Sequence, residues 1–329
     1  MRGKDAARLL DQVATRSIQT LKVGQVAYTP WCDAAGKVLD DGTVARLDET
    51  TFRMTAAEPN LRWLQDNAQG LEVEIEDVSD ALAALSLQGP ASRAIVGVDL
   101  QYFRLTEAKL GDIPVTISRT GYTGDLGYEI WMQHDRALAV WDELIEAGAP
   151  YGMVPAGMLA LDVARIEAGL MLIDVDYVPA RKALIESQTS SPYELDLGWA
   201  VNLQKDRFVG REALAAEARR TPEWQFVGIE IEWESLERLY AEVGLATRLP
   251  AAAWRTSVPI YAGTEQAGYA TSGGWSPLLK KYIALAHLRA PWAAPGTQLD
   301  IEITVEHRRQ RAAARVVKKP FFDPERKRA

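Results

Sequence analysis

The sequence predicts an α+β fold built from ferredoxin-like, split βαβ units, followed by a separate all-β barrel. Its 329 residues, 47% of them hydrophobic, are enough for two domains with cores of their own. In the first half, the expected elements follow the order strand, helix, strand, strand, helix, strand, which is typical of split βαβ units. From Trp224 onward, short strands and turns indicate a small barrel. We therefore expect an α+β region over residues 1–222 and a barrel over residues 223–329.

The composition argues against several classes of function. The net charge of −8 and the scattered basic residues argue against a nucleic-acid-binding protein, which has a clustered basic face. No apolar run reaches the ~20 residues of a membrane-spanning helix, and no signal peptide is evident, so we expect a soluble, cytoplasmic protein. A single cysteine, Cys32, and three widely separated histidines argue against a disulfide and against a metal site. The basic residues among the last dozen positions predict a solvated tail.

The first third of the chain contains two strands that carry a pair of acids. Apolar residues at helical spacing predict a helix over Ala6–Val13. A turn at Asp33–Gly36 separates strands expected at 23–29 and 37–46. The next expected elements are a strand at 51–55, a helix at 59–68, strands at 71–75 and 78–84, and a helix at 91–96.

Asp40 and Asp41 are adjacent on the second expected strand. Neighbouring residues of a strand point to opposite faces, so one of the two carboxylates faces inward. A buried carboxylate needs a partner or a function. The inward aspartate is therefore either a structural hydrogen-bond acceptor or a functional group, and both alternatives stay open at this point.

The stretch Ser118–Met132 predicts a strand, a tight loop and a second strand. Its loop contains three glycines at a spacing of three: Gly121, Gly124 and Gly127. Tyr122 and Glu129 are not needed merely to make this turn. An aromatic ring beside a carboxylate suits a flat heterocycle, because the ring stacks and the carboxylate accepts from ring N–H groups. The alternative interpretation is a long polar hairpin with exposed tyrosines.

The remaining elements complete the two expected regions. Helices are predicted at 135–147, 156–168 and 208–218, and Asp162 and Arg165 can pair on one face of the second. Barrel strands are predicted at 225–233, 257–261, 283–286, 298–305 and 312–317.

The order Thr-Gly-Tyr-Thr-Gly at 120–124, followed by Gly-Tyr-Glu at 127–129, closely resembles the central motif of the folate-dependent aminomethyltransferase family. That family includes the T protein of the glycine cleavage system and related tetrahydrofolate-dependent demethylases. Further motifs match the family and follow in its order. Three are continuous, at 88–90, 208–214 and 317–321. Two are made of separate pieces, one at 155–157 and 162–168 and the other at 271–273, 276–277 and 283–286. The resemblance covers essentially the whole chain.

The resemblance implies a role for each candidate site residue. Asp41 is the expected catalytic carboxylate of a central folate channel. The residues expected to bind tetrahydrofolate are Tyr28, Asp40, Tyr122, Glu129 and Arg165. A desolvated aspartate can orient the weakly basic ring nitrogen that attacks a one-carbon group, and no metal is required.

Departures from the family pattern leave the one-carbon donor open. Leu161 stands where the family has an arginine that is a probable anchor for the folate tail, and Lys280–Lys281 replace Leu-Gly. The expected partner is a small-molecule or carrier-bound donor of a methyl or aminomethyl group. The alternatives are a demethylase that acts on an O-, S- or N-methylated small molecule and a non-catalytic folate-binding protein. The chain also lacks roughly the first fifty residues of the family, which predicts an exposed sheet edge and a possible homodimer.

Overall fold

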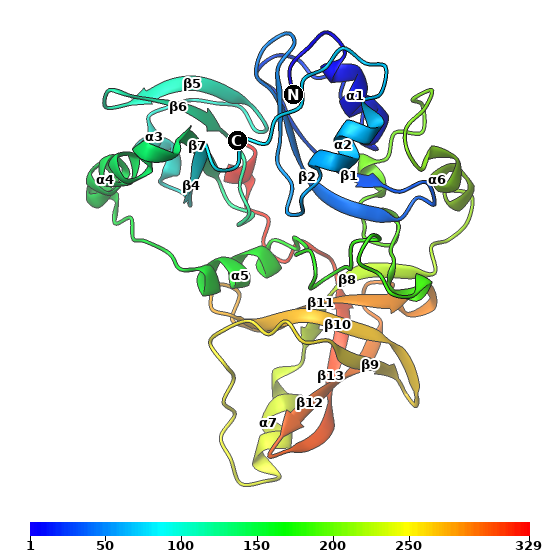
Figure 1. Cartoon of the computed structure of the whole chain (residues 1–329). Coiled ribbons are helices and arrows are strands. Elements are labelled where there is room, and N and C mark those ends of the chain that lie inside the picture. The colour runs from blue at the N-terminus through cyan, green and yellow to red at the C-terminus, as the bar shows by residue number, and fades with distance from the viewer.

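The computed structural model describes all residues, 1–329, and it arranges them in three β structures. The first is an antiparallel sheet in the order β1-β2-β3, formed by Val26–Cys32, Val38–Arg46 and Phe52–Met54. Helices α1 (Ala6–Val13) and α2 (Leu61–Asn67) accompany this sheet (Figure 1). Ala6 and Leu10 of α1 pack against Val44 of β2, so the apolar face of α1 belongs to the core of this first part.

The second sheet carries the glycine-rich loop between two of its strands. Its order is β4-β7-β6-β5, formed by Leu82–Gln88, Gly127–Gln133, Ile113–Ser118 and Leu105–Leu110. Helices α3 (Ser92–Val96) and α4 (Ala137–Gly148) cover one face, where Val140 and Leu144 pack against Ile117 and Ile130. The loop from β6 to β7 therefore starts and ends on strands that a shared core holds in place.

The third part is a closed six-stranded barrel, so the predicted α+β fold with a C-terminal barrel is confirmed. Its strands run in the order β10-β11-β8-β13-β12-β9. They span Trp224–Ile231 (β8), Val258–Ala262 (β9), Glu265–Ser276 (β10), Lys281–Arg289 (β11), Gln298–Val305 (β12) and Arg308–Val317 (β13). Helix α5 (Met158–Glu167) lies across β10 and β11 (Figure 1), and α6 (Arg211–Glu217) precedes the barrel. We propose residues 222–223 as the domain boundary, because β8 begins directly after them.

Two expectations for local structure differ from what the chain forms. The strand expected at 71–75 is wrong, because this segment makes only one isolated bridge, between Glu74 and Arg2. Its alternating Leu71, Val73 and Ile75 pack against a small core cluster without joining a ladder. The first strand continues through Pro30, which lies opposite Asp41. Proline is tolerated there because β1 is an edge strand.

The basic C-terminal segment is docked rather than solvated. Arg326 donates two hydrogen bonds, each 2.7 Å long, to the carboxylate of Asp125 in the β6–β7 loop. Arg119 donates to the carbonyl oxygens of Arg326 at 3.2 Å and Lys327 at 3.0 Å. The sequence did not reveal this docking because Asp125 and Arg326 are 201 residues apart.

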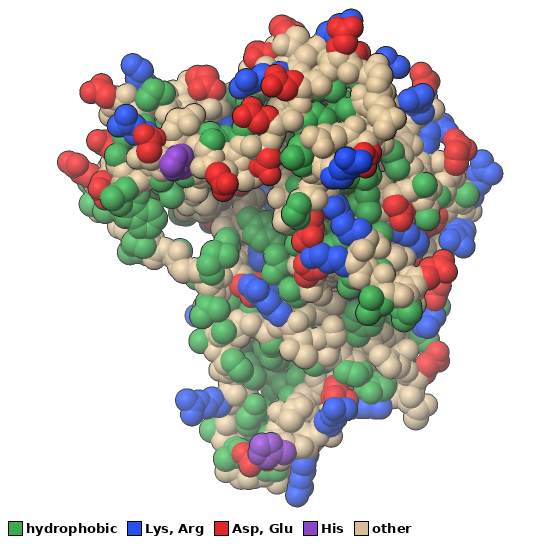
Figure 2. Space-filling view, in the orientation of Figure 1, with side chains coloured by type: hydrophobic (Ala, Val, Ile, Leu, Met, Phe, Trp, Pro, Cys, Tyr) green, Lys and Arg blue, Asp and Glu red, His purple; other side chains and the backbone are tan.

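Acidic and basic side chains are interspersed over the face of the molecule that Figure 2 shows. None of the helices combines the length and the hydropathy needed to cross a membrane.

Candidate active site

A cavity of about 700 Å³ opens where the first sheet, the β6–β7 loop and three later segments meet. Its wall includes Asp41 and Thr43 of β2, Tyr28 of β1, seven residues between 120 and 129, residues 169–171, four residues between 195 and 199, and Lys319 and Lys327 near the end of the chain. This volume lies within the roughly 300–1,000 Å³ that small-molecule and cofactor sites occupy. Four of the predicted site residues line it: Tyr28, Asp41, Tyr122 and Glu129.

Two tyrosines hold the carboxylate of Asp41 from different elements. The Tyr28 hydroxyl donates to Oδ2 of Asp41 at 2.7 Å, and the Tyr177 hydroxyl donates to Oδ1. Burial raises the pKa of Asp41, the hydrogen bonds from Tyr177 and Tyr28 act in the opposite direction, and the charge of Asp40 raises it further. Burial and the charge of Asp41 raise the pKa of both tyrosines, so they remain hydrogen-bond donors at neutral pH. The carboxylate is therefore oriented, desolvated and still able to accept at its remaining lone pairs.

Asp40 lies on the opposite face of β2 and does not line the cavity. It is fully buried, and its oxygens accept from the backbone N–H of Asp41 at 2.8 Å and of Glu58 at 2.9 Å. The side-chain amide of Asn60 donates to it at 3.0 Å. Strand alternation thus makes Asp40 the structural acceptor and turns Asp41 toward the cavity.

The β6–β7 loop brings Tyr122 and Glu129 to the cavity. The Tyr122 hydroxyl donates to the carbonyl oxygen of Met171, and burial raises the pKa of this phenol. Glu129 is the first outward residue of β7 after the loop, and the Thr120 hydroxyl donates to its Oε2 at 2.6 Å. These bonds fix both side chains before any ligand enters.

The side chain of Gln88 packs directly against two of the loop glycines. The side chain of Gln88 lies across the loop and bonds the Thr123 hydroxyl at 3.1 Å. A Cβ added at Gly121 or Gly127 would lie 2.2 Å or 1.9 Å from its amide oxygen. A side chain at either position would therefore displace Gln88 from its present place across the loop.

Arg165 lies beneath the cavity rather than on its wall. It is buried, with Nε donating to Asp162 at 2.9 Å and Nη1 bonding Asp176. Asp176 also accepts from the hydroxyls of Thr271 and Ser272, which belong to barrel strand β10. Arg165 thus takes part in the contact between α5 and the barrel and supports the wall segment 169–171 from behind.

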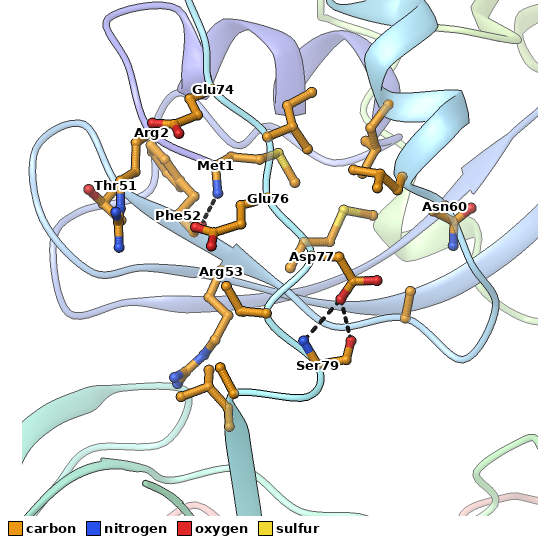
Figure 3. A pocket seen from close by; sticks show the side chains of 18 of the residues that line it. Met1, Arg2, Thr51, Phe52, Arg53, Asn60, Glu74, Glu76, Asp77 and Ser79 are labelled. Carbon is orange, nitrogen blue, oxygen red and sulfur yellow. Dashed lines mark hydrogen bonds between the residues drawn. The ribbon is translucent and has the colours of Figure 1, made fainter. Parts of the chain in front are cut away.

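A second cavity, of about 550 Å³, lies beside α2 and the edge of the first sheet (Figure 3). None of the predicted site residues lines it. Figure 3 shows Asp77, which accepts from the backbone and the hydroxyl of Ser79 at 2.9 and 2.6 Å. Arg53 reaches away from this cavity toward the second sheet, where its guanidinium lies 4.3 Å from the ring centroid of Trp131.

Comparison with known proteins assigns the chain to a family. A family model described as the GCVT N-terminal domain matches residues 1–205, and one described as the glycine cleavage T-protein C-terminal barrel domain matches residues 242–323. The chain belongs to the glycine cleavage T-protein family. The expected family membership is therefore confirmed.

Individual relatives agree with this family. The chain is 33% identical to an aminomethyltransferase of Halothermothrix orenii, over 97% of this chain and 84% of that protein. It is 34% identical to a trimethylamine-oxide aldolase of Ruegeria pomeroyi, over 99% of this chain but only 40% of that protein. Its fold resembles the crystal structure of the glycine cleavage system aminomethyltransferase T from Bartonella henselae, with a TM-score of 0.79, 26% identity, and 98% and 82% of the two chains covered. This member of the T-protein family is thus an enzyme of the transferase class.

Sequence reasoning missed Tyr177, Trp199 and Arg16. Tyr177 lies in a stretch with few periodic features, so no pattern indicated that it reaches Asp41. Trp199 stacks on Tyr28 with ring centroids 6.1 Å apart and planes 23° from parallel. Arg16 lies over the Trp199 ring at 5.6 Å. The one sequence signal for Trp199 was its position shortly before the matched motif at 208–214.

Proposed function

We propose that this T-protein family member is a tetrahydrofolate-dependent one-carbon transferase in which Asp41 is the catalytic carboxylate. The observation that supports the proposal most strongly is the position of Asp41. It faces a cofactor-sized cavity and is held on both oxygens by tyrosines. Tyr122 and Glu129 stand on the wall of the same cavity.

The residues of the cavity fit a reduced folate. The faces of the aromatic side chains Tyr28, Tyr122 and Trp199 offer stacking surfaces for a flat bicyclic ring. The carboxylates of Asp41 and Glu129 accept hydrogen bonds from ring N–H groups. A bound tetrahydrofolate supplies a ring nitrogen that takes up the one-carbon group.

The chain's own residues orient the reactants and manage a proton. Tyr28 and Tyr177 fix the plane of the Asp41 carboxylate, so it presents a free lone pair to an N–H group at a set position. Because burial raises the pKa of Asp41, this carboxylate is a better proton acceptor near neutral pH than an exposed aspartate. Glu129, fixed by Thr120, holds the cofactor edge in register with Asp41.

We infer that the donor is an aminomethyl or methyl group on a small molecule or on a carrier protein. Relatives named aminomethyltransferase support an aminomethyl donor. The relative named trimethylamine-oxide aldolase supports a second candidate, a demethylase of a small methylated amine. Leu161, in place of the family's arginine, sets this chain apart at one position of the shared motif.

The test is isothermal titration with tetrahydrofolate of the wild type and of Asp41→Ala and Tyr122→Ala. We expect micromolar binding that both substitutions weaken, and loss of turnover by at least about a hundredfold in Asp41→Asn with any donor that the wild type accepts. A wild type that does not bind tetrahydrofolate would contradict the proposal. A screen of aminomethyl and N-methyl donors then separates the two candidate reactions.

A further inference from the structure

The guanidinium of Arg53 crosses from the first sheet to the second. Arg53 lies on β3, opposite Ala45 of β2, and Figure 3 shows its side chain extending toward the second sheet. There its guanidinium carbon lies 4.3 Å from the ring centroid of Trp131 on β7. Trp131 and Glu129 are two residues apart on this strand, so their side chains leave it on the same face. Arg53 therefore approaches the face of β7 that carries Glu129.

Arg53 and Glu129 also line the same small cavity between the two sheets. This cavity has a volume of about 10 Å³, and they are the only charged residues among the nine that line it. Thr43, Thr120 and Glu129 line both this small cavity and the cavity of about 700 Å³ that forms the candidate site, whereas Arg53 does not line the candidate site. Glu129 therefore connects Arg53 to the place where a ligand would bind.

Two carboxylates act on Arg53 through their charges. Burial lowers the pKa of Arg53, and the charges of Glu107 and Glu129 act in the opposite direction. Glu107 is exposed and does not line the small cavity, so water screens its charge. Glu129 is half-buried, and its interaction with Arg53 across the small cavity is screened less.

The direct hydrogen-bond partner of Glu129 brings no positive charge. The Thr120 hydroxyl donates to Oε2 of Glu129 at 2.6 Å, and this hydroxyl lies 2.8 Å from that of Ser118. These neutral groups fix one carboxylate oxygen. A cation beside a carboxylate adds to this by favouring the charged form, which is the form that accepts strong hydrogen bonds from N–H groups.

We propose that Arg53 is a positioning residue that acts on the cofactor through Glu129. Packed on Trp131, its guanidinium places a positive charge beside the carboxylate and so keeps Glu129 charged and oriented for the ligand. The inference rests on the proposed function, because it takes Glu129 as the group that accepts from the edge of a reduced folate. A contact between the two sheets then affects binding in a cavity that Arg53 does not line.

The test is a double-mutant cycle of ligand affinity. Isothermal titration with tetrahydrofolate compares the wild type, Arg53→Gln, Glu129→Gln and the variant with both changes. We expect Arg53→Gln to weaken binding about fivefold in the wild-type background but less than about twofold in the Glu129→Gln background, because coupled residues are not additive. Arg53→Lys, which keeps the charge, should bind more tightly than Arg53→Gln. Arg53→Met keeps a flexible side chain on Trp131 and gives the same cycle if Arg53→Gln does not fold.

Arg311→Gln is the matched control. The Arg311 guanidinium also lies over an aromatic ring, that of Tyr261 at 3.6 Å, but Arg311 belongs to barrel strand β13 and does not line the candidate site. This variant should bind tetrahydrofolate as the wild type does. An equal loss from Arg53→Gln in both backgrounds means that Arg53 supports only the fold, and it overturns the proposal. Unchanged affinity of Arg53→Gln overturns it as well. A wild type that does not bind tetrahydrofolate instead overturns the proposed function.

Discussion

Asp41 is the residue at which the proposed function and the stability of the fold oppose each other. A carboxyl group whose pKa is higher in the folded protein than in the unfolded chain binds its proton more tightly in the folded state. Its contribution to stability is complete below the unfolded pKa, about 4, and is lost as the pH rises through the raised folded value. For Asp41, the cause of the raised pKa is first of all burial.

We therefore expect Asp41→Asn to be inactive but not less stable at neutral pH. The difference in Tm between Asp41→Asn and the wild type should move in favour of the variant as the pH rises from about 4 toward 7. Differential scanning calorimetry over this range measures it. A difference that stays constant with pH would show that Asp41 titrates normally in the folded protein.

Tyr177 acts on the same carboxylate through one hydrogen bond. Because this bond stabilises the charged form of Asp41, Tyr177→Phe should raise its pKa further and move the acid limb of the activity profile to higher pH. Tyr28, Asp40 and Tyr122 also interact electrostatically with Asp41, and all three remain in the variant. The pH dependence of turnover with any accepted donor measures the shift. Tyr193→Phe is the control, since Tyr193 packs against the core cluster that contains Tyr177 but makes no hydrogen bond to Asp41.

At the scale of the elements, Gly124 sets the contact between the β6–β7 loop and the end of α5. Its φ is +71°, and an added Cβ would lie 2.5 Å from the Cβ of Ala168. Gly124→Ala should destabilise the fold by about 2 kcal/mol or more, through backbone strain and overpacking. Urea denaturation measures the loss. The double variant with Ala168→Gly should recover the part due to overpacking, and no recovery would mean that backbone strain accounts for the whole loss.

Local sequence patterns predicted an element where its apolar residues recur regularly along one face. The spacing of apolar residues gave the bounds of α1, and alternation gave those of β12, 298–305. Strand β10 and helix α7 (Trp233–Ala241) were not predicted. Three glycines interrupt the pattern of β10, and two of them lie against close neighbours that leave no room for a side chain. A Cβ at Gly268 would lie 2.0 Å from the carbonyl oxygen of His287, and one at Gly273 would lie 2.3 Å from Trp254.

The candidate site was predictable to the extent that its residues lie in motifs. Family resemblance selected Tyr28, Asp41, Tyr122 and Glu129, and the structure brings these together in one cavity. It could not indicate Tyr177, which is 136 residues from Asp41 and outside any matched motif. It selected Asp41 as the catalytic carboxylate, but it also assigned Asp40 to the cofactor, and only the strand register shows that Asp40 lies on the opposite face of β2.

At the scale of the whole molecule, Asp176 joins the barrel to the region that contains the cavity. It is buried and accepts from Arg165, from the backbone of Leu172 at 2.8 Å and from Ser272 at 2.7 Å. Asp176→Ala should cost about 3–5 kcal/mol, because it removes one partner of a buried ion pair. Calorimetry should then show the barrel and the first region unfolding in separate transitions. A single transition at unchanged Tm would mean that Asp176 does not couple the two regions.

The cavity wall has a consequence for the order of folding. Its residues come from positions 16 to 327, so the wall is complete only when segments far apart in the sequence have come together. Contacts of such long sequence separation form late, after the local hairpins and helices. The complete cavity is therefore expected to form late in folding. A ligand that binds only this final state draws the chain toward it by mass action, and so acts as a chemical chaperone for the enzyme that uses it.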